Sequence, residues 1–204
     1  TPIVPIVSSG KLARISEGLG AAAVIVEGSE AGGHLGTNRS SREIVPEVLK
    51  AVKNIPVIGA GGVLDGKDIV EMMKLGANGV QMGSRFAASE ECNASDELKK
   101  MYLRAKAPED VVLIESPVGL PGQAIRNKFA ASVLDGTVPP PTECDRCLKH
   151  CSHKFCLIKA LERAQQGDVE TGLVFSGNNM RKVDEILPVK EIFRRLLAEV
   201  SQID

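Results

Sequence analysis

Short apolar runs alternate with amphipathic stretches along the first half of the chain. "PIVPIV" (2–7) and "AAAVIVEGS" (21–29) are apolar runs, and "IPVIGAGGV" (55–63) and "NGVQMGS" (78–84) repeat the pattern with glycines at their ends. Such runs are typical of parallel strands that are buried on both faces. Apolar residues recur at helical spacing after the runs. The pattern therefore predicts four strand–helix units.

The expected helices differ in how they pack. In "REIVPEVLKAV" (42–52), Pro46 is expected in the first turn, where a missing N–H costs little. "ELKKMYLRAKA" (97–107) is predicted to be an amphipathic helix with a solvated face. The helix over 65–76 is expected to turn a stripe of Ile69, Met72, Met73 and Leu75 inward. The C-terminal helix is expected to pack Ile192, Phe193, Leu196 and Leu197 onto the body.

Four strand–helix units fit either an open doubly wound sheet or a (β/α)8 TIM barrel. Glycines and polar residues follow the second, third and fourth strands directly, and this is the end of a barrel where active sites are built. The sequence therefore predicts an α/β fold of the TIM-barrel type, of which residues 1–106 form roughly the C-terminal half. A closed barrel takes about 250 residues, so we expect the other half to be missing from this sequence or contributed elsewhere.

Residues 107–204 no longer repeat the strand–helix pattern. They are predicted to form an α-rich covering segment that contains a stiff proline-rich linker, "DGTVPPPTE" (135–143), and a cysteine cluster. The domain boundary is therefore expected near residue 106.

Composition and charge narrow the range of partners. The 204 residues are 43% hydrophobic and 25% charged, which suits a globular chain with a sizeable core. The formal net charge is −1 and the two signs are interspersed, so neither a nucleic acid nor an anionic membrane is expected as a partner. No apolar run reaches the roughly 18 residues of a membrane span, and the opening residues do not have the pattern of a signal peptide. We expect a cytoplasmic protein that binds a small-molecule substrate, and that forms a homo-oligomer or associates with the other half of the barrel.

Two successive glycine-rich loops predict an anion site. "AGGVLDG" and "QMGSRF" each follow a predicted strand and precede a helix, which places Gly61 and Gly62 in one loop and Gly83 and Ser84 in the next. Free backbone N–H groups at such positions bind phosphate, and barrels often carry a phosphate site in two late loops. The alternative is that these glycines only permit tight turns.

His34 lies in a third glycine-rich loop, "EGSEAGGHLG" (27–36). Gly32 and Gly33 precede it, and it falls on the expected catalytic face. An imidazole titrates near neutral pH and is a natural proton acceptor. Glu27 and Glu30 could orient the ring or be exposed, and a lone loop histidine is often only solvated.

These loops, taken in order, closely resemble the nitronate monooxygenase (2-nitropropane dioxygenase) family, which includes FMN-dependent enoyl-[acyl-carrier-protein] reductases. "EGSEAGGHLG" and "IPVIGAGGVLDGKDIVEMMKLGANGVQMGSRFAASEE" carry the resemblance, and "SGNNM" (176–180) has an asparagine where the family often has a glutamine near the flavin. The resemblance implies a barrel that binds FMN, with His34 as the active-site histidine. It implies that Gly61, Gly62, Gly83 and Ser84 hold the FMN phosphate and that Gly32 and Gly33 lie against the flavin.

The resemblance leaves the reaction open between two chemistries. In the monooxygenases the histidine deprotonates a neutral nitroalkane, and the nitronate is oxidised with O2 to a carbonyl compound and nitrite. In the reductases it supports reduction of an enoyl thioester with NAD(P)H through the flavin. We take FMN-dependent oxidation of nitronates as the first hypothesis and the reductase as the second. A third is an inactive fragment that acts as a metal-binding or interaction module.

Four of the five cysteines lie within thirteen residues. "CDRCLKHCSHKFC" spaces Cys144, Cys147, Cys151 and Cys156 as C-x2-C-x3-C-x4-C. Four thiolates at such spacing can enclose a zinc ion or an iron–sulfur cluster. The alternative is that some of these cysteines are packed thiols, since a helix is predicted to begin at about Cys156.

Overall fold

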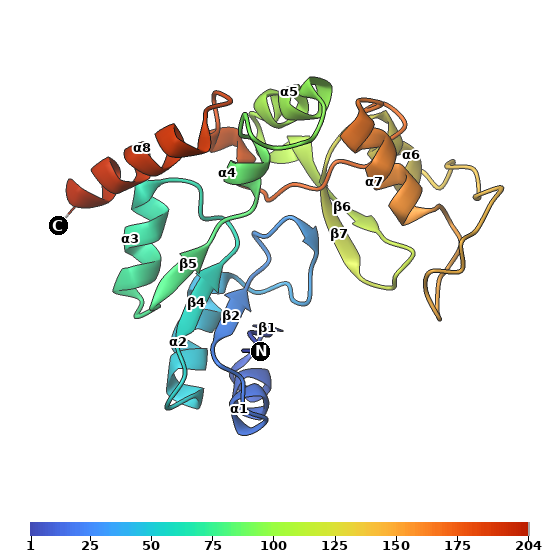
Figure 1. Cartoon of the computed structure of the whole chain (residues 1–204). Coiled ribbons are helices and arrows are strands. Elements are labelled where there is room, and N and C mark those ends of the chain that lie inside the picture. The colour runs from blue at the N-terminus through green and yellow to red at the C-terminus, as the bar shows by residue number, and fades with distance from the viewer. Residues whose placement is uncertain (204) are drawn as a thin grey trace.

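The computed structural model describes residues 1–203 and contains two β-sheets covered by helices (Figure 1). The first sheet has four parallel strands in the spatial order β1-β2-β4-β5. This is also their order along the chain. A doubly wound sheet reverses its strand order at a switch point, whereas a barrel adds strands in sequence. The order therefore favours an arc of a barrel. The strands are β1 (Ile6–Val7), β2 (Val24–Glu27), β4 (Val57–Ala60) and β5 (Gly79–Gln81).

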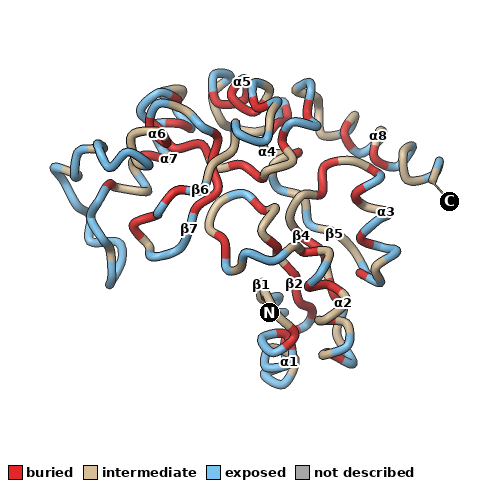
Figure 2. Tube along the Cα trace, turned by 180° about the vertical axis from the view of Figure 1, so that it is seen from behind, coloured by how far each residue is buried: buried red, intermediate tan, exposed pale blue. Residues whose placement is uncertain are grey.

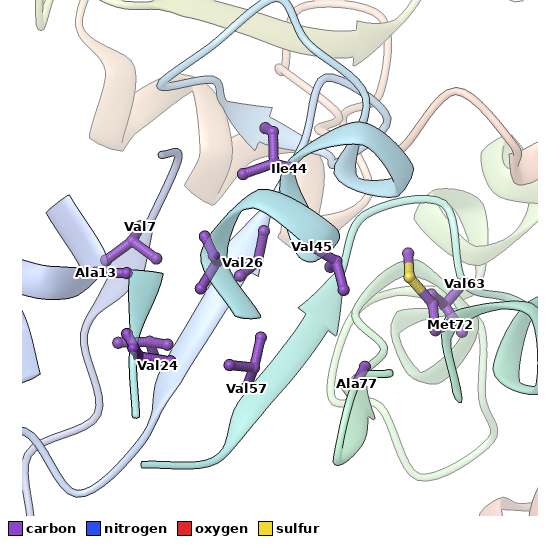
Figure 3. Close-up of a cluster of buried hydrophobic side chains, with 12 residues drawn as sticks. Val7, Ala13, Val24, Val26, Ile44, Val45, Val57, Val63, Met72 and Ala77 are labelled. Atoms are coloured by element: carbon purple, nitrogen blue, oxygen red, sulfur yellow. The ribbon is translucent and has the colours of Figure 1, made fainter. Parts of the chain in front are cut away.

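Helices α1 (Gly10–Gly18), α2 (Ser41–Ala51) and α3 (Gly66–Lys74) follow successive strands of this sheet (Figure 1). Valines of the strands meet apolar side chains of the helices in one buried cluster, in which Ile44 and Met72 are fully buried (Figure 3). Gly59 permits this packing, because a Cβ there would lie 2.9 Å from the Met72 sulfur. The four predicted strand–helix units are thus present, although the first strand has only two residues.

Two predictions about these helices are wrong. Helix α2 begins at Ser41, because the Ser40 side chain caps it by accepting a hydrogen bond from the Arg42 amide. Pro46 consequently lies inside the helix, past the first turn, where the missing N–H does remove a helical hydrogen bond. In α3, Met73 is 46% exposed and does not belong to the inward stripe.

The second sheet was not predicted. Strands β6 (Val111–Glu115) and β7 (Pro121–Ile125) form an antiparallel hairpin, and β3 (Gly33–His34) pairs with the other side of β7. The covering segment therefore contains a hairpin as well as helices, and its sheet includes the loop that carries His34. The helices of this segment are α6 (Lys128–Leu134), α7 (Leu157–Gln166) and α8 (Val189–Ser201), with a 3-10 turn at each of Pro108–Asp110 and Met180–Lys182.

Helices α4 (Ser84–Ala87) and α5 (Asp96–Arg104) connect the parallel sheet to the hairpin. The prediction of an amphipathic α5 with a solvated face is confirmed. Its other face buries Leu98, Met101 and Tyr102 (Figure 2). The buried Lys99 donates a hydrogen bond from its ammonium group to the Glu90 carbonyl. Within residues 1–203, no helix is long and apolar enough to cross a membrane.

Helix α8 returns the C-terminus to the parallel sheet and packs against α3 (Figure 1). The Gly66 amide donates a hydrogen bond to the Glu199 carboxylate at 2.6 Å, and a Cβ on Gly66 would lie 2.4 Å from the Glu199 Cβ. Ile192 and Leu196 are buried as predicted, but Phe193 and Leu197 are 52% and 65% exposed. Only half of the expected apolar face of α8 is therefore covered.

Candidate functional site

The loops that follow β2, β4 and β5 meet at one pocket of about 380 Å³. This volume is within the usual range of small-molecule sites, roughly 300–1,000 Å³. All six residues predicted to bind a cofactor line the pocket, which brings together positions more than fifty residues apart in the chain. They are Gly32, Gly33, Gly61, Gly62, Gly83 and Ser84.

The two late loops are shaped to receive an anion. Gly61 and Gly62 adopt left-handed φ angles of 92° and 70°, which side chains with a Cβ rarely adopt. Among residues 1–203, no hydrogen bond is donated by the backbone N–H groups of Gly62, Gly83 or Ser84. A Cβ on Gly83 would meet no atom within 4 Å, so the space beside it is open to a ligand. Free amides beside open space fit a phosphate group.

A segment far along the chain closes this pocket, and it is the "SGNNM" stretch (176–180) that the family resemblance related to the flavin. The Gly177 amide donates to the Ser84 hydroxyl at 3.1 Å, and the Asn179 side chain donates to the Gly62 carbonyl at 3.0 Å. Gly32 packs against the same segment, since a Cβ there would lie 2.7 Å from the Gly177 nitrogen. Ser84 still has its own hydroxyl hydrogen to donate. The buried Asn178 side-chain oxygen accepts no hydrogen bond in residues 1–203.

His34 stands at the edge of the pocket. Its Nε2 lies 2.7 Å from the Ser116 hydroxyl, and its ring packs edge-on against Phe175 at 5.2 Å between centroids. Phe175 itself lines the pocket, whereas His34 does not. Partial burial lowers the pKa of His34 below the ordinary value of 6.5. The imidazole is therefore neutral at neutral pH and able to accept a proton.

Ser116 is the partner of His34 that the sequence did not reveal. It is buried in the turn between β6 and β7, where its carbonyl accepts from the Gly119 amide at 3.0 Å. Gly119 has a left-handed φ of 84°, which this turn requires. A hydrogen bond to one ring nitrogen fixes the orientation of an imidazole. The direction in which the hydrogen runs depends on the histidine tautomer.

Neither nearby carboxylate hydrogen-bonds to His34. Glu30 instead accepts from the Ser41 amide at 3.0 Å and from the Ser40 hydroxyl, at the start of α2. Glu27 lines the pocket, and burial raises its pKa. The orienting role that the sequence left open to these two residues is thus taken by Ser116.

Tyr102 also lines the pocket, from α5. Its hydroxyl donates to the Phe175 carbonyl at 3.2 Å, and burial raises its pKa to about 12. Tyr102 therefore remains protonated at neutral pH. It fixes the backbone of the residue that packs against His34.

The cysteine cluster lies away from this pocket. All five cysteines are free thiols, and Cys144 and Cys147 are exposed. Within residues 1–203, no three His, Cys, Asp or Glu side chains already converge as metal ligands do. Helix α7 begins directly after Cys156, as predicted.

Known proteins share the sequence pattern and the fold of this chain. The family profile described as nitronate monooxygenase matches residues 1–199. The chain is 30% identical over 202 residues to a probable nitronate monooxygenase of Staphylococcus aureus, and this alignment covers 92% of the chain and 53% of that protein. The chain spans about half the length of the curated relatives it matches.

Two solved structures share the fold over the whole chain. FabK from Thermotoga maritima aligns with a TM-score of 0.84 and 36% identity, over 100% of this chain and 62% of that one. Nitroalkane oxidase from Streptomyces ansochromogenes aligns with a TM-score of 0.79 and 26% identity, over 99% of this chain and 58% of that one. The α/β fold therefore corresponds to part of a TIM barrel.

Proposed function

Because the chain belongs to the nitronate monooxygenase family, we propose that the complete protein is an oxidoreductase that binds FMN in the pocket of the glycine-rich loops. The observation that carries the proposal is the meeting of all six predicted cofactor residues in one pocket, with a neutral histidine at its edge. The chain spans about half the length of its relatives. The proposed activity is therefore that of the complete protein and not of this segment alone.

We propose that further strands close the parallel sheet into a (β/α)8 barrel. Strand β1 has a neighbour on one side only among residues 1–203, and the apolar side chains around it are exposed. An exposed edge flanked by apolar side chains is a surface that folded proteins normally cover. The exposed residues are Ile3, Ile6, Leu12, Ile15 and Leu19.

FMN would be held through its phosphate and its ring. Gly62, Gly83 and Ser84 offer free amides to the phosphate, and Ser84 adds a hydroxyl. Gly61 lies in the same loop as Gly62, and Gly32 and Gly33 line the pocket where the flavin would lie. When bound, FMN supplies the capacity to take electrons from a substrate and pass them to an acceptor.

His34 is proposed as the general base. Its neutral imidazole accepts a proton from the carbon next to a nitro group, while the hydrogen bond to Ser116 holds the ring in place. Its other ring nitrogen, Nδ1, makes no hydrogen bond within residues 1–203. The proposed reaction is oxidation of a nitronate with O2 to a carbonyl compound and nitrite. A neutral nitroalkane would first lose its proton to His34.

An enoyl-thioester reductase is the second candidate. The higher identity to FabK, 36% against 26% for nitroalkane oxidase, favours it. It would use NAD(P)H, with the same pocket and the same histidine. Both reactions need a small-molecule substrate beside the flavin, so the geometry of the pocket supports either.

Two assays on the complete protein separate the two reactions. Oxygen-dependent release of nitrite from a nitronate supports the first, and oxidation of NADH in the presence of a crotonyl thioester supports the second. A flavin-loaded protein with neither activity would contradict both. The inactive-fragment alternative predicts bound zinc or iron and no retained flavin.

Replacing Ser116 by alanine is expected to lower turnover about fivefold. The lost hydrogen bond to His34 Nε2 is worth about 1 kcal/mol, and a tenfold change in rate corresponds to about 1.4 kcal/mol. Ser116→Thr keeps the hydroxyl and should restore part of the rate. A positioning role also predicts that Ser116→Ala shifts the pH profile of kcat, whereas a purely structural role would change the melting temperature without moving that profile.

The pH dependence of the reaction should reflect His34. A base works in its neutral form, and burial lowers the pKa of this imidazole below 6.5. Activity on a neutral nitroalkane should therefore persist as the pH falls through 6.5 and be lost only at the lower pKa. The pH profile of kcat/KM measures the pKa at which activity falls on the acidic side. A pKa at or above 6.5 there would show that His34 is not the titrating base.

A further inference from the structure

The segment from residue 137 to residue 156 has no helix or strand, yet it contains four of the five cysteines and two of the three histidines. It projects from the body beside α6 and α7 and is exposed over most of its length (Figures 1 and 2). Irregular segments longer than about 12–15 residues are uncommon in compact domains and are often functional. We propose that Cys144, Cys147, Cys151 and Cys156 of this segment bind one zinc ion as four thiolate ligands.

The four sulfur side chains share one cavity. Cys144, Cys147, Cys151 and Cys156 all line a cavity of about 150 Å³ between the segment and the start of α7, together with His153. The remaining walls are mostly apolar and include Leu148, Phe155, Leu157 and Ile158. An apolar shell around a cluster of thiolates excludes water, as structural zinc sites require.

Polar contacts inside the cluster already bring donors together. The Cys144 sulfur lies 3.9 Å from Nδ1 of His153, and the His153 amide donates to the Cys151 sulfur at 3.5 Å. Backbone N–H groups directed at sulfur are the outer contacts that orient thiolate ligands. Because the ligands do not yet converge on one point, the thiols must rotate inward when the ion binds.

The backbone of the cluster is held in an unusual conformation. Arg146 and His153 have φ angles of 51° and 56°, and they are the non-glycine residues with positive φ in residues 1–203. A left-handed conformation costs such residues roughly 1 kcal/mol or more, so it persists only where other interactions stabilise it. Arg146 directly precedes Cys147 and lies between the two cysteines of the C-x2-C pair. Metal–sulfur bonds would supply the missing stabilisation.

Four thiolates favour zinc among the soft metals. Zinc takes tetrahedral sulfur ligands without redox chemistry, and sets of four cysteines are among its structural sites. The C-x2-C-x3-C-x4-C spacing differs from the C-x2-C-x2-C run of bacterial iron–sulfur proteins. Iron with acid-labile sulfide is therefore the competing outcome of the test.

The zinc site would lie against the turn that positions His34. The Ser152 amide donates to the Pro117 carbonyl at 3.1 Å, and the Lys154 ammonium pairs with Glu115 at 2.6 Å. Pro117 and Glu115, which receive these two contacts, are the chain neighbours of Ser116 at the β6–β7 turn. Zinc would therefore order a segment that supports this turn, without itself contacting the pocket.

The test is to measure metal in the complete protein, purified without chelators. Elemental analysis is expected to find about one zinc per chain. Titration of the reduced, metal-free protein with Co²⁺ should give the visible bands of a tetrahedral thiolate site. The double variant Cys144→Ser/Cys147→Ser should lower metal affinity by roughly 100-fold or more. Cys92→Ser, which changes the cysteine outside the cluster, should retain full zinc content.

Other outcomes would overturn the proposal. Finding iron with acid-labile sulfide would show that the cysteines hold an iron–sulfur cluster and not zinc. Finding neither zinc nor Co²⁺ binding in the reduced protein would show that the cysteines form no metal site. Loss of zinc in His153→Ala would contradict the assignment of four thiolates.

Trypsin provides an independent measurement, because removal of zinc by a chelator should accelerate cleavage at the exposed Lys149, both in the unchanged protein and in Cys92→Ser.

Discussion

Replacing His34 by alanine in the complete protein is expected to reduce turnover of a neutral nitroalkane by on the order of 10²- to 10⁴-fold while flavin stays bound. This is the usual contribution of a positioned general base. The flavin should be retained because His34 does not line the pocket formed by the glycine-rich loops. Steady-state kinetics and the flavin absorbance of the same preparation measure the two effects separately.

A matched histidine provides the control. His150 is exposed in the cysteine segment and lies outside the pocket of the glycine-rich loops, although it lines a separate cavity with Ser116, and His150→Ala should change turnover far less than His34→Ala. A preformed nitronate needs no proton abstraction, so it should be oxidised by His34→Ala with a much smaller loss. Equal losses for the nitroalkane and the nitronate would mean that His34 acts on a step other than proton transfer, and an unchanged rate would remove it from the mechanism.

The pocket could be predicted from the sequence because its signals are local. A buried parallel strand followed by glycines fixes where a loop begins, and parallel strands end at one edge of their sheet. The loops after β2, β4 and β5 therefore had to approach one another, and they do. The glycine pair after β4 also indicated an unusual loop backbone, since few residues other than glycine adopt the left-handed φ of Gly61 and Gly62.

The support of His34 could not be predicted, because it depends on contacts between distant parts of the chain. Ser116 lies 82 residues from His34 and belongs to a turn with no catalytic signature. The two are adjacent only because β3 pairs with β7, and a two-residue strand has no periodicity that a sequence pattern could reveal. Gly177 and Asn179 also reach the pocket from far along the chain, and the family resemblance of "SGNNM" indicated them where no periodic pattern did.

The burial of apolar helix faces could be predicted only in part. Helix α5 has the expected solvated face, and its other face buries Tyr102 and Met101 against the segment before α8. Amphipathic spacing shows that a helix has an apolar face but not which element covers it. Phe193 and Leu197 of α8 were expected to be buried, but both are more than half exposed, although the Phe193 ring packs against Phe86.

Replacing Gly83 by valine is expected to lower FMN affinity by roughly 10- to 100-fold without unfolding the protein. The φ of Gly83 is −103°, which valine can adopt, and a Cβ there would meet no protein atom within 4 Å. The new side chain would instead occupy the space proposed for the phosphate. Forcing extra methyl groups into an occupied volume costs about 1–3 kcal/mol.

Gly18 provides the matched control for this substitution. It lies at the end of α1, outside the pocket, and a Cβ there would also meet no atom within 4 Å. Gly18→Val should therefore retain full flavin content, and both variants should melt close to the unchanged protein. Fluorescence titration of the metal-replete, flavin-free protein with FMN measures the affinity. Unaltered affinity in Gly83→Val would place the phosphate elsewhere, whereas equal weakening in both variants would point to a general effect of valine on the fold.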